Sequence, residues 1–379
     1  MTGAIVLAAD YRGLGVVRSL GRQNVTVWVL AEPGERLAGM SRYAARTLRR
    51  PSGDLVRFLL ELEGCDGWAL FPTTDEDAAL LGRRHDELSK RFVVTSPPWD
   101  VVRWTYDKRL MHQIAQEMGI PAPRTAFGHP DGVGFPAILK PAVKVARNRF
   151  TNAKAWRVDS PEQLRARFQE AARLVEPDVI MVQELVPGGG DAQLSYAALC
   201  LDGEPVAALT ALRVRQYPAD FGRASTYVET AAIPDIVEPS ERFLRRIGFT
   251  GLVEIEYKRD SRDGVAKLLD MNPRVWGWHT LGAAAGIDFS WLLWLQARGE
   301  SVPPAEARNG ARWLRLSTDL PTSVHELARR RLAVLPYVRT LLSPRESAIV
   351  ARDDLLPGLV ELPLLAATAL RRLARGDEL

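Results

Sequence analysis

Short apolar runs alternate with helical patterns along the first hundred residues. The runs at residues 4–10, 25–31, 68–73 and 92–96 are rich in valine, leucine and phenylalanine and predict buried strands. Between the last two runs, residues 75–88 have apolar positions at helical spacing and predict a helix. An order of this kind is typical of βαβ units, so we expect a mainly parallel sheet.

A clearly delimited helix follows. Asp107 is a suitable N-cap, the apolar positions of residues 110–118 form one stripe, and Gly119 ends the helix before Pro121. Lys108 lies in the first turn, where its positive charge opposes the helix dipole. Because only 7 of the 50 Lys and Arg residues are lysine, we interpret Lys108 as a contact for an anionic partner. A solvated surface lysine is the alternative.

From residue 135 onward the strand patterns dominate. Residues 135–144 predict a strand that contains Lys140, and residues 160–174 predict a helix. Residues 179–190 predict a strand that runs into a glycine-rich turn. Residues 191–257 then follow an antiparallel pattern, in which an Asp-Gly pair predicts a hairpin.

Residues 251–274 predict a further hairpin with polar side chains on one face. Its Asp-Gly turn places Glu256 opposite Asp270, and Asn272 shares the face of Asp270 because side chains two apart on a strand point the same way. Two carboxylates this close repel unless a cation lies between them. Oxygen ligands without histidine or thiol suit magnesium, which takes its remaining ligands from water and phosphate. The alternative is a solvent-exposed face with unconnected charges.

Composition excludes several classes of protein. A chain of 379 residues with 46% hydrophobic and 25% charged residues is typical of a globular protein of two or three domains. No apolar run is long enough to span a bilayer, and the N-terminal run predicts a first strand instead of an export signal. Cys65 and Cys200 lack metal-binding spacing and favour a reducing, cytoplasmic location. The scattered net charge of +4 argues against nucleic acid.

Several motifs occur together in an order known from one family. They are DKRLMHQIAQEMGIPAP (107–123), FPAILKP (135–141), VQELVPG (182–188), VEIEYKRD (253–260) and LLDMNPR (268–274). In this combination the chain resembles the ATP-grasp superfamily over roughly residues 1–300. RQYPADFG (215–222) and GID (286–288) make it similar to stand-alone bacterial carboxylate–amine or carboxylate–thiol ligases.

The resemblance implies an ATP-grasp fold that combines α/β and α+β parts. We expect an N-terminal parallel α/β (pre-ATP-grasp) domain at residues 1–105 and a linker helix with a small α+β lid at residues 106–187. An antiparallel-sheet catalytic subdomain is expected at residues 188–300. Residues 301–379, rich in Arg, Leu, Ala and Pro, are expected to form a helical C-terminal extension.

The resemblance also implies which residues bind the nucleotide and metal. The lysines that contact ATP phosphates match Lys108 and Lys140. The hinge that hydrogen-bonds adenine matches four residues, Gln183, Glu184, Leu185 and Val186. The ligands of magnesium, or of manganese in its place, match Glu256, Asp270 and Asn272.

Three arginines match cations near the reacting groups. Arg274 matches the arginine that faces the reacting carboxylate or acyl phosphate. Arg213 and Arg215 lie where family members often carry a cation near the γ-phosphate.

The chain departs from the family pattern in three places. Asp270 stands where the usual Glu-x-Asn-Pro-Arg motif has glutamate, and its side chain is one methylene shorter. The loop after Lys140 lacks the glycines that commonly let a loop close over phosphates. Its basic residues could replace backbone amides there: Lys144, Arg147, Arg149 and Lys154. Beyond residue 300 no motif that carries chemistry is recognised.

The implied reaction is an ATP- and magnesium-dependent ligation. A small carboxylic acid, such as an amino acid or peptide, becomes an acyl phosphate, and an amine displaces phosphate to form an amide, with release of ADP. The alternatives are a small-molecule kinase and a non-catalytic nucleotide-binding protein. Glu254 and His279 are candidates for the general base, with packing beside Trp276 and Trp278 as the alternative for His279.

Residues 351–376 combine apolar turns with a basic end. Packing against the body of the protein is one interpretation, and contact with a membrane surface or a partner protein is the alternative. The quaternary structure is left open, with a homodimer as one option.

Overall fold

The computed structural model describes residues 3–143, 145–146, 148–153, 155–217, 224–343 and 345–363. The N-terminal part is a five-stranded sheet with strand order β3-β2-β1-β4-β5, and every neighbouring pair is parallel. Its strands are β1 (Gly3–Val6), β2 (Thr26–Ala31), β3 (Ala44–Arg49), β4 (Ala69–Phe71) and β5 (Val93–Val94). The expected parallel sheet is confirmed. No apolar run marks β3 because it is a largely exposed edge strand.

Helices cover both faces of this sheet. Helix α1 (Tyr11–Arg22) packs on the face that carries Ala4 and Val6, and α2 (Leu55–Glu61) packs on the face that carries Ile5 and Leu7. The remaining helical elements of this part are η1 (Ala38–Met40), α3 (Asp75–Arg83) and α4 (His85–Leu88). Short polar side chains begin three of the helices by accepting backbone N–H groups: Asp10 for α1, Asp54 for α2 and Thr74 for α3.

Two consecutive helices lead to a second, smaller sheet. They are α5 (Trp99–Tyr106) and α6 (Lys108–Glu117), and Asp107 caps α6 as expected. The sheet has the order β6-β9-β7-β8 and is antiparallel. Its elements are β6 (Thr125–Phe127), β7 (Ala137–Pro141), α7 (Arg149–Asn152), β8 (Trp156–Val158), α8 (Pro161–Ala172), η2 (Pro177–Val179) and β9 (Ile180–Glu184).

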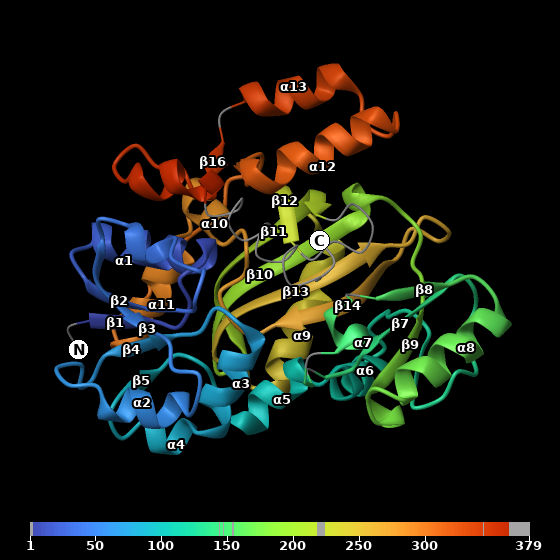
Figure 1. The fold of residues 1–379 in the computed structure, drawn as a ribbon, viewed down its shortest axis with the longest axis horizontal. Helices are drawn as coiled ribbons and strands as arrows, with labels where there is room; N and C mark the ends of the chain where they lie inside the picture. The colour runs from blue at the N-terminus through green and yellow to red at the C-terminus, as the bar shows by residue number, and fades with distance from the viewer. Residues whose placement is uncertain are drawn as a thin grey trace.

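A seven-stranded sheet forms the centre of the molecule and lies between the first two sheets (Figure 1). Its order is β14-β13-β10-β11-β12-β15-β16, and only the last pair is parallel. The strands are β10 (Gln193–Leu201), β11 (Glu204–Tyr217), β12 (Ala224–Thr230), β13 (Gly251–Arg259), β14 (Ala266–Asn272), β15 (Arg312–Leu314) and β16 (Glu346–Ser347). The other elements of this region are η3 (Gly190–Ala192), η4 (Pro234–Ile236), α9 (Val237–Ile247), α10 (Thr280–Ala285) and α11 (Phe289–Ala297).

The central sheet is buried on both faces. One face joins the hydrophobic core that includes α1 and α11, and the other packs on α6 and α9. The N-terminal part, the four-stranded sheet and the central sheet meet at the hairpin β13–β14 and the residues that follow it.

The C-terminal region crosses back over the molecule. It contains α12 (Leu316–Ala328), α13 (Val334–Leu342) and a further helical segment at residues 356–363. It is not purely helical, because β15 and β16 extend the central sheet. Asp354 also forms a buried ion pair with Arg18 of α1, at 2.8 Å. The part of the expected basic end beyond residue 363 lies outside the described residues. Within the described residues, no helix is long and apolar enough to cross a membrane.

Candidate active site

The hairpin β13–β14 brings the predicted acidic residues together. Glu256 pairs with Asp270 and Glu254 pairs with Asn272, as the Asp-Gly turn led us to expect for the first pair. The amide nitrogen of Asn272 donates to Glu256 Oε1 at 2.9 Å and to Glu254 Oε2 at 3.2 Å. These side chains therefore form one polar cluster on a single face of the sheet.

Two cationic side chains neutralise the facing carboxylates. Lys108, the first residue of α6, forms an ion pair with Asp270, and Arg213 of β11 forms one with Glu256. Arg213 is only 4% exposed, and its Nε also donates to Ser225 Oγ at 2.7 Å. Because the charges are shielded from water, each carboxylate needs a positive partner.

The donor set of this cluster fits a hard divalent ion that completes its shell with water and phosphate. Glu256 and Asp270 offer two facing carboxylates, and a metal ion between them would take over part of the role of Lys108 and Arg213. Within the described part of the chain, no group of three or more His, Cys, Asp or Glu side chains forms a complete metal site. Asn272 Oδ1 accepts from Arg274 Nη2 at 2.9 Å, so it could join a metal only by exchanging this bond.

Glu254 lies behind the facing pair and is 4% exposed. Its carboxyl group accepts from Trp278 Nε1 at 2.8 Å and from Ser195 Oγ at 3.0 Å. Burial, together with the neighbouring charge of Glu256, raises the pKa of Glu254 to about 7. The general-base role suggested for this residue stays a prediction, and the geometry makes Glu254 an anchor for Asn272 and Trp278.

Arg274 connects the hairpin to the N-terminal part of the molecule. Its Nε donates to Asp75 Oδ1 at 2.7 Å, and its Nη1 donates to the carbonyl of Val275 at 3.2 Å. Asp75 is the first residue of α3, where a negative charge is favoured by the helix dipole. With Asn272 as a third partner, the guanidinium is fixed at the junction of β14 and α3.

Arg213 and Arg215 have different partners, although both were expected near the phosphates. Arg215 donates to both carboxylate oxygens of Asp319 in α12, at 2.8 and 3.0 Å. Its guanidinium also lies 4.4 Å from the ring centre of Tyr227 and 5.2 Å from that of Tyr337. The structure therefore brings Arg213 to the acidic pair but uses Arg215 to hold the C-terminal region. Arg215 turns to the C-terminal region because Asp319, more than a hundred residues later in the chain, offers it a buried carboxylate.

The predicted phosphate lysines lie around a histidine that the sequence analysis missed. Burial, and the nearby charges of Lys140 and Lys108, lower the pKa of His112 to about 3. His112 Nε2 lies 3.3 Å from the side-chain nitrogen of Gln183, which also donates to Thr125 Oγ1 at 3.0 Å. His112 follows Lys108 by four residues on α6, so helical spacing alone could have marked it as part of the same surface.

The predicted hinge is the end of β9. Glu184 accepts the backbone N–H of Arg124 at 3.1 Å, and Lys267 and Arg262 each lie 3.4 Å from its carboxylate. The backbone N–H of Leu185 donates to the carbonyl of Pro136, and Val186 is buried. This segment thus links the four-stranded sheet to the turn of the hairpin β13–β14. Adenine binding by these residues remains a prediction.

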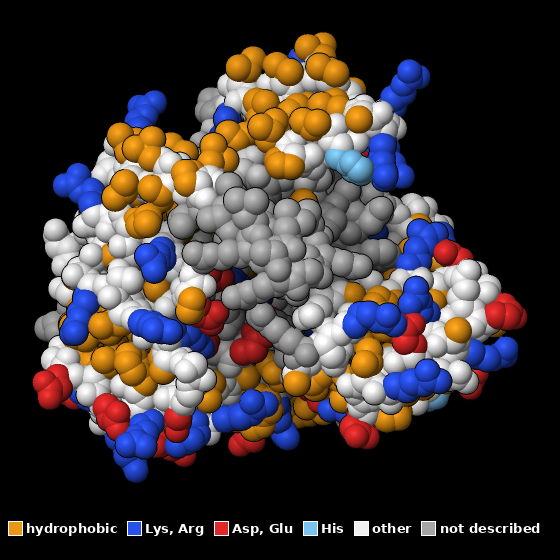
Figure 2. All heavy atoms as spheres, viewed as in Figure 1, with side chains coloured by type: hydrophobic (Ala, Val, Ile, Leu, Met, Phe, Trp, Pro, Cys, Tyr) orange, Lys and Arg blue, Asp and Glu red, His pale blue; other side chains and the backbone are white. Residues whose placement is uncertain are grey.

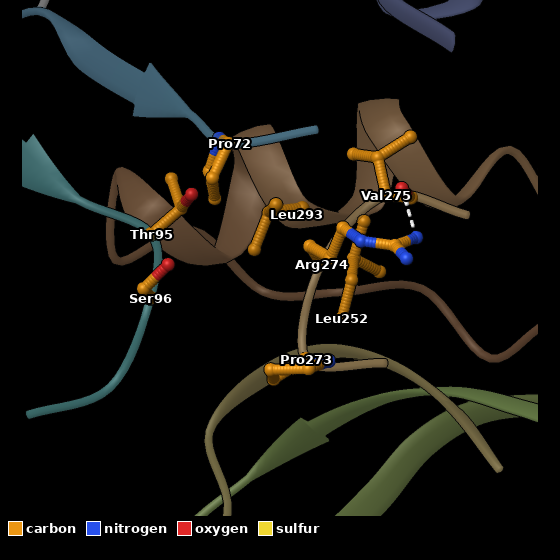
Figure 3. A pocket seen from close by; sticks show the side chains of 8 residues that line it. All are labelled: Pro72, Thr95, Ser96, Leu252, Pro273, Arg274, Val275 and Leu293. Carbon is orange, nitrogen blue, oxygen red and sulfur yellow. Dashed lines mark hydrogen bonds between the residues drawn. The ribbon is translucent and has the colours of Figure 1, made fainter. Parts of the chain in front are cut away.

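A small cavity of about 10 Å³ lies beside the backbone of Arg274 (Figure 3). Its walls are Pro72, Thr95, Ser96, Leu252, Pro273, Arg274, Val275 and Leu293. The guanidinium of Arg274 points away from Ser96 and Thr95 towards the carbonyl of Val275 in this view. The cavity has room for no more than one water molecule, so it is not a substrate pocket.

His279 and the neighbouring tryptophans are packing residues. Trp276, Trp278 and His279 are each at most 3% exposed, and His279 Nδ1 lies 3.0 Å from the carbonyl of Trp276. Burial lowers the pKa of His279 to about 4. A Cβ atom on Gly15 of α1 would lie 2.5 Å from the imidazole ring. His279 therefore fills the interface with α1, which supports the packing alternative over a general base.

The glycine-poor loop after Lys140 is described only in part. Arg149 begins α7 and pairs with Glu170 of α8. Lys144, Arg147 and Lys154 lie outside the described residues, as do residues 218–222 of the RQYPADFG element.

Comparison with known proteins identifies the class of this fold. Residues 178–318 match the family described as ATP-grasp in the biosynthetic pathway with Ter operon. A D-aspartate ligase from Enterococcus faecium is 26% identical over 55% of this chain and 53% of its own length. A carbamoyl phosphate synthase large chain from Gemmatimonas aurantiaca is 25% identical over 51% of this chain and 18% of its own length. The chain thus spans about half, or much less, of these relatives.

Solved structures agree over most of the chain. The biotin carboxylase domain of 2-oxoglutarate carboxylase from Hydrogenobacter thermophilus, bound to MgADP, superimposes with a TM-score of 0.63 at 15% identity and covers 82% of this chain and 74% of that one. An L-amino acid ligase from Bacillus licheniformis gives a TM-score of 0.58 at 16% identity, covering 80% and 77%. N5-carboxyaminoimidazole ribonucleotide synthetase from Thermus thermophilus gives 0.61 at 16% identity, covering 82% of each. The chain therefore has the ATP-grasp fold, as its motifs predicted.

Proposed function

We propose that this protein is an ATP- and magnesium-dependent carboxylate–amine ligase that forms an amide through an acyl phosphate and releases ADP and phosphate. The observation that carries the proposal is the facing pair Glu256 and Asp270, with a lysine and an arginine already bound to it. Similarity to a D-aspartate ligase and to an L-amino acid ligase supports the choice of reaction. We expect it to act in the cytoplasm.

The proposed nucleotide site uses charges from three elements. Lys108 of α6 and Lys140 of β7 would neutralise phosphate oxygens, and burial together with their positive charges lowers the pKa of the neighbouring His112. Gln183 to Val186 would bind adenine. When bound, magnesium, or manganese in its place, would be held by Glu256, Asp270 and the oxygen of Asn272 and would withdraw charge from the leaving ADP oxygen.

Arg274 would receive the organic acid. A planar guanidinium presents paired donors that match a carboxylate or phosphate, and it reduces the repulsion between the acid and the γ-phosphate. In the structure, Arg274 Nε donates to a carboxylate of the protein itself, that of Asp75. A substrate carboxylate would compete with Asp75 for the same donors. The amine then forms the C–N bond, the C–O bond to phosphate breaks, and the amine loses a proton.

Product analysis with purified protein tests the proposal. ATP, magnesium and a panel of amino-acid pairs are supplied, and ADP, phosphate and amide are measured. Added hydroxylamine should trap the acyl phosphate as a hydroxamate. Asp270→Asn should lower kcat/KM by about 100-fold or more, because it weakens the charge stabilisation at the transferring phosphate. Asp263→Asn, in the turn of the same hairpin, is the matched control and should retain activity.

Three results would contradict the proposal. Release of AMP and pyrophosphate would refute the acyl phosphate route. A phosphorylated product that resists hydroxylamine would identify a small-molecule kinase. Nucleotide binding without turnover by any pair, unchanged in Asp270→Asn, would indicate a non-catalytic nucleotide-binding protein.

A further inference from the structure

The C-terminal layer, which we define as residues 316–363 with α12 and α13, has an unusual surface. Of the eighteen large hydrophobic side chains that the described residues expose, twelve lie in this layer. Figure 2 shows hydrophobic side chains gathered over α12 and α13 at the top of the view. Contiguous apolar surface of this kind on a folded protein marks a site of interaction.

Helix α12 exposes apolar side chains and buries polar ones, which is the opposite of an ordinary surface helix. Leu316, Leu320 and Val324 follow one another at intervals of four residues and are 48%, 46% and 55% exposed. This spacing places them in one stripe along the helix. The buried residues of the same helix are polar, namely Asp319 and Ser323. The apolar stripe of α12 therefore faces outward.

Helix α13 repeats the pattern. Leu335 and Leu342 are 60% and 79% exposed, and Val334 and Val338 lie on the same side. Only Tyr337 of this helix is buried. The helical segment at residues 356–363 adds further exposed leucines at spacings of three residues, Leu356, Leu359 and Leu362.

The charges of the layer are sorted by sign. All six arginines within residues 316–363 are exposed: Arg329, Arg330, Arg331, Arg339, Arg345 and Arg352. Most of the acidic side chains are buried or paired with the body of the protein, and the other two, Glu326 and Glu346, are half-buried. Asp319, Asp354 and Glu361 are buried, and the exposed Asp353 is paired with Arg22 of α1 at 2.8 Å. The outer surface of the layer is consequently both apolar and positive.

We propose that the C-terminal layer docks on an anionic lipid bilayer. Leucine and valine stripes would enter the boundary between headgroups and acyl chains, and the arginines would lie at the level of the negative headgroups. Long arginine side chains reach polar headgroups while their stems stay in apolar surroundings. The attachment is peripheral, since the helices involved are too short to span a bilayer.

A lipid surface fits this layer better than a second copy of the chain. A second copy would bring the same arginines against one another, because identical patches meet in a two-fold interface. A bilayer instead supplies negative charge at the rim and an apolar interior below it. The inference does not depend on the proposed ligase activity, because no residue of the candidate active site takes part.

Vesicle flotation of the full-length protein tests the inference. Vesicles of phosphatidylcholine alone are compared with vesicles of phosphatidylcholine and phosphatidylglycerol, at low and high salt. We expect binding that requires phosphatidylglycerol and falls as salt rises. Leu335→Asp combined with Leu342→Asp should weaken binding by more than about tenfold, since two apolar side chains no longer enter the bilayer. Arg339→Glu should weaken it by at least about fivefold.

Matched controls distinguish specific docking from unfolding and from non-specific binding to vesicles. Leu201→Asp changes a leucine that is 47% exposed at the end of β10, and Arg173→Glu changes an exposed arginine directly after α8. Both controls should bind vesicles like the unaltered protein. All of the variants change exposed side chains, so circular dichroism and melting temperature should be unchanged.

Three outcomes would overturn the inference. One is absence of binding to the anionic vesicles. Another is equal binding with and without phosphatidylglycerol. The third is binding that survives the leucine and arginine changes. A dimer in sedimentation that dissociates in the Leu335→Asp, Leu342→Asp variant, without vesicle binding, would show that a second copy covers the layer.

Discussion

The buried ion pair between Arg215 and Asp319 is expected to fasten α12 to the central sheet. Asp319 is fully buried, accepts two hydrogen bonds from Arg215, and accepts a third from Thr226 Oγ1 at 2.7 Å. Asp319→Asn keeps the shape of the side chain but removes its charge and replaces one acceptor oxygen with a donor. The guanidinium of Arg215, enclosed by Tyr227 and Tyr337, would then lack its counter-charge.

Breaking a buried pair by removing one partner costs roughly 3–5 kcal/mol, because the other charge is left buried without compensation. Since about 1.4 kcal/mol corresponds to a factor of ten, the opening of α12 should become about two to four orders of magnitude more frequent. Hydrogen exchange measured by mass spectrometry over residues 316–328 reports this local opening. Residues 75–83 of α3 serve as an internal reference, because their exchange should not change.

Glu326→Gln is the matched control on the same helix. Glu326 lies 4.0 Å from Arg331, and such a loose pair contributes at most about 1 kcal/mol. Exchange in the control should therefore stay within a fewfold of the unaltered protein. If Asp319→Asn and Glu326→Gln had equal effects, the ion pair would not hold α12. If Asp319→Asn instead weakened ATP binding without faster exchange, Arg215 would act on phosphate, as the family resemblance first suggested.

Three other positions offer independent checks. His112 has a pKa of about 3 in the folded protein and an ordinary pKa of 6.5 in the unfolded chain, so between these pH values only the unfolded chain gains the proton. The free energy of unfolding should therefore fall as pH drops from about 6.5 towards 3. In His112→Gln, urea unfolding should show a weaker dependence on pH over this range. Gly15→Ala should lower the melting temperature, at a cost of about 1–3 kcal/mol, because the new Cβ atom would lie 2.5 Å from His279, whereas Gly53→Ala meets nothing within 4 Å and should be neutral. Asp354→Asn should make residues 346–363 sensitive to protease, because it leaves Arg18 buried without its partner. Asp86→Asn, at a fully exposed position, should not change protease sensitivity. Equal sensitivity of the two variants would show that the ion pair does not hold this segment in place.

Local patterns predicted much of the structure. The parallel N-terminal sheet followed from alternating apolar runs and helical stretches, and the cap at Asp107 followed from residues adjacent in sequence. The pairing of Glu256 with Asp270 was accessible because a short hairpin fixes its own register through the turn. The helix cap and the hairpin depend on residues that are close to one another in the sequence.

The contacts that complete the site could not be predicted in the same way. Arg274 and Asp75 are 199 residues apart, and Arg215 and Asp319 are 104 apart. In a chain with 43 arginines, no local pattern distinguishes an arginine that binds substrate from one that forms an ion pair between two helices or strands. Strands β15 and β16 were also missed, since three and two residues are too few to show a period.

Arg274 is proposed to bind substrate and also connects two elements of the fold. Each of its three nitrogens donates to one partner: Nη2 to Asn272 of β14, Nε to Asp75 of α3 and Nη1 to the carbonyl of Val275. The partner from α3 is a carboxylate, which is the same chemical group that the proposed ligase must bring to this arginine. A bound acid would release Asp75 and so weaken the link between the N-terminal part and the hairpin β13–β14. Substrate binding and the position of α3 are therefore expected to be coupled through one guanidinium group, with Asp75 as a stand-in when the acid is absent.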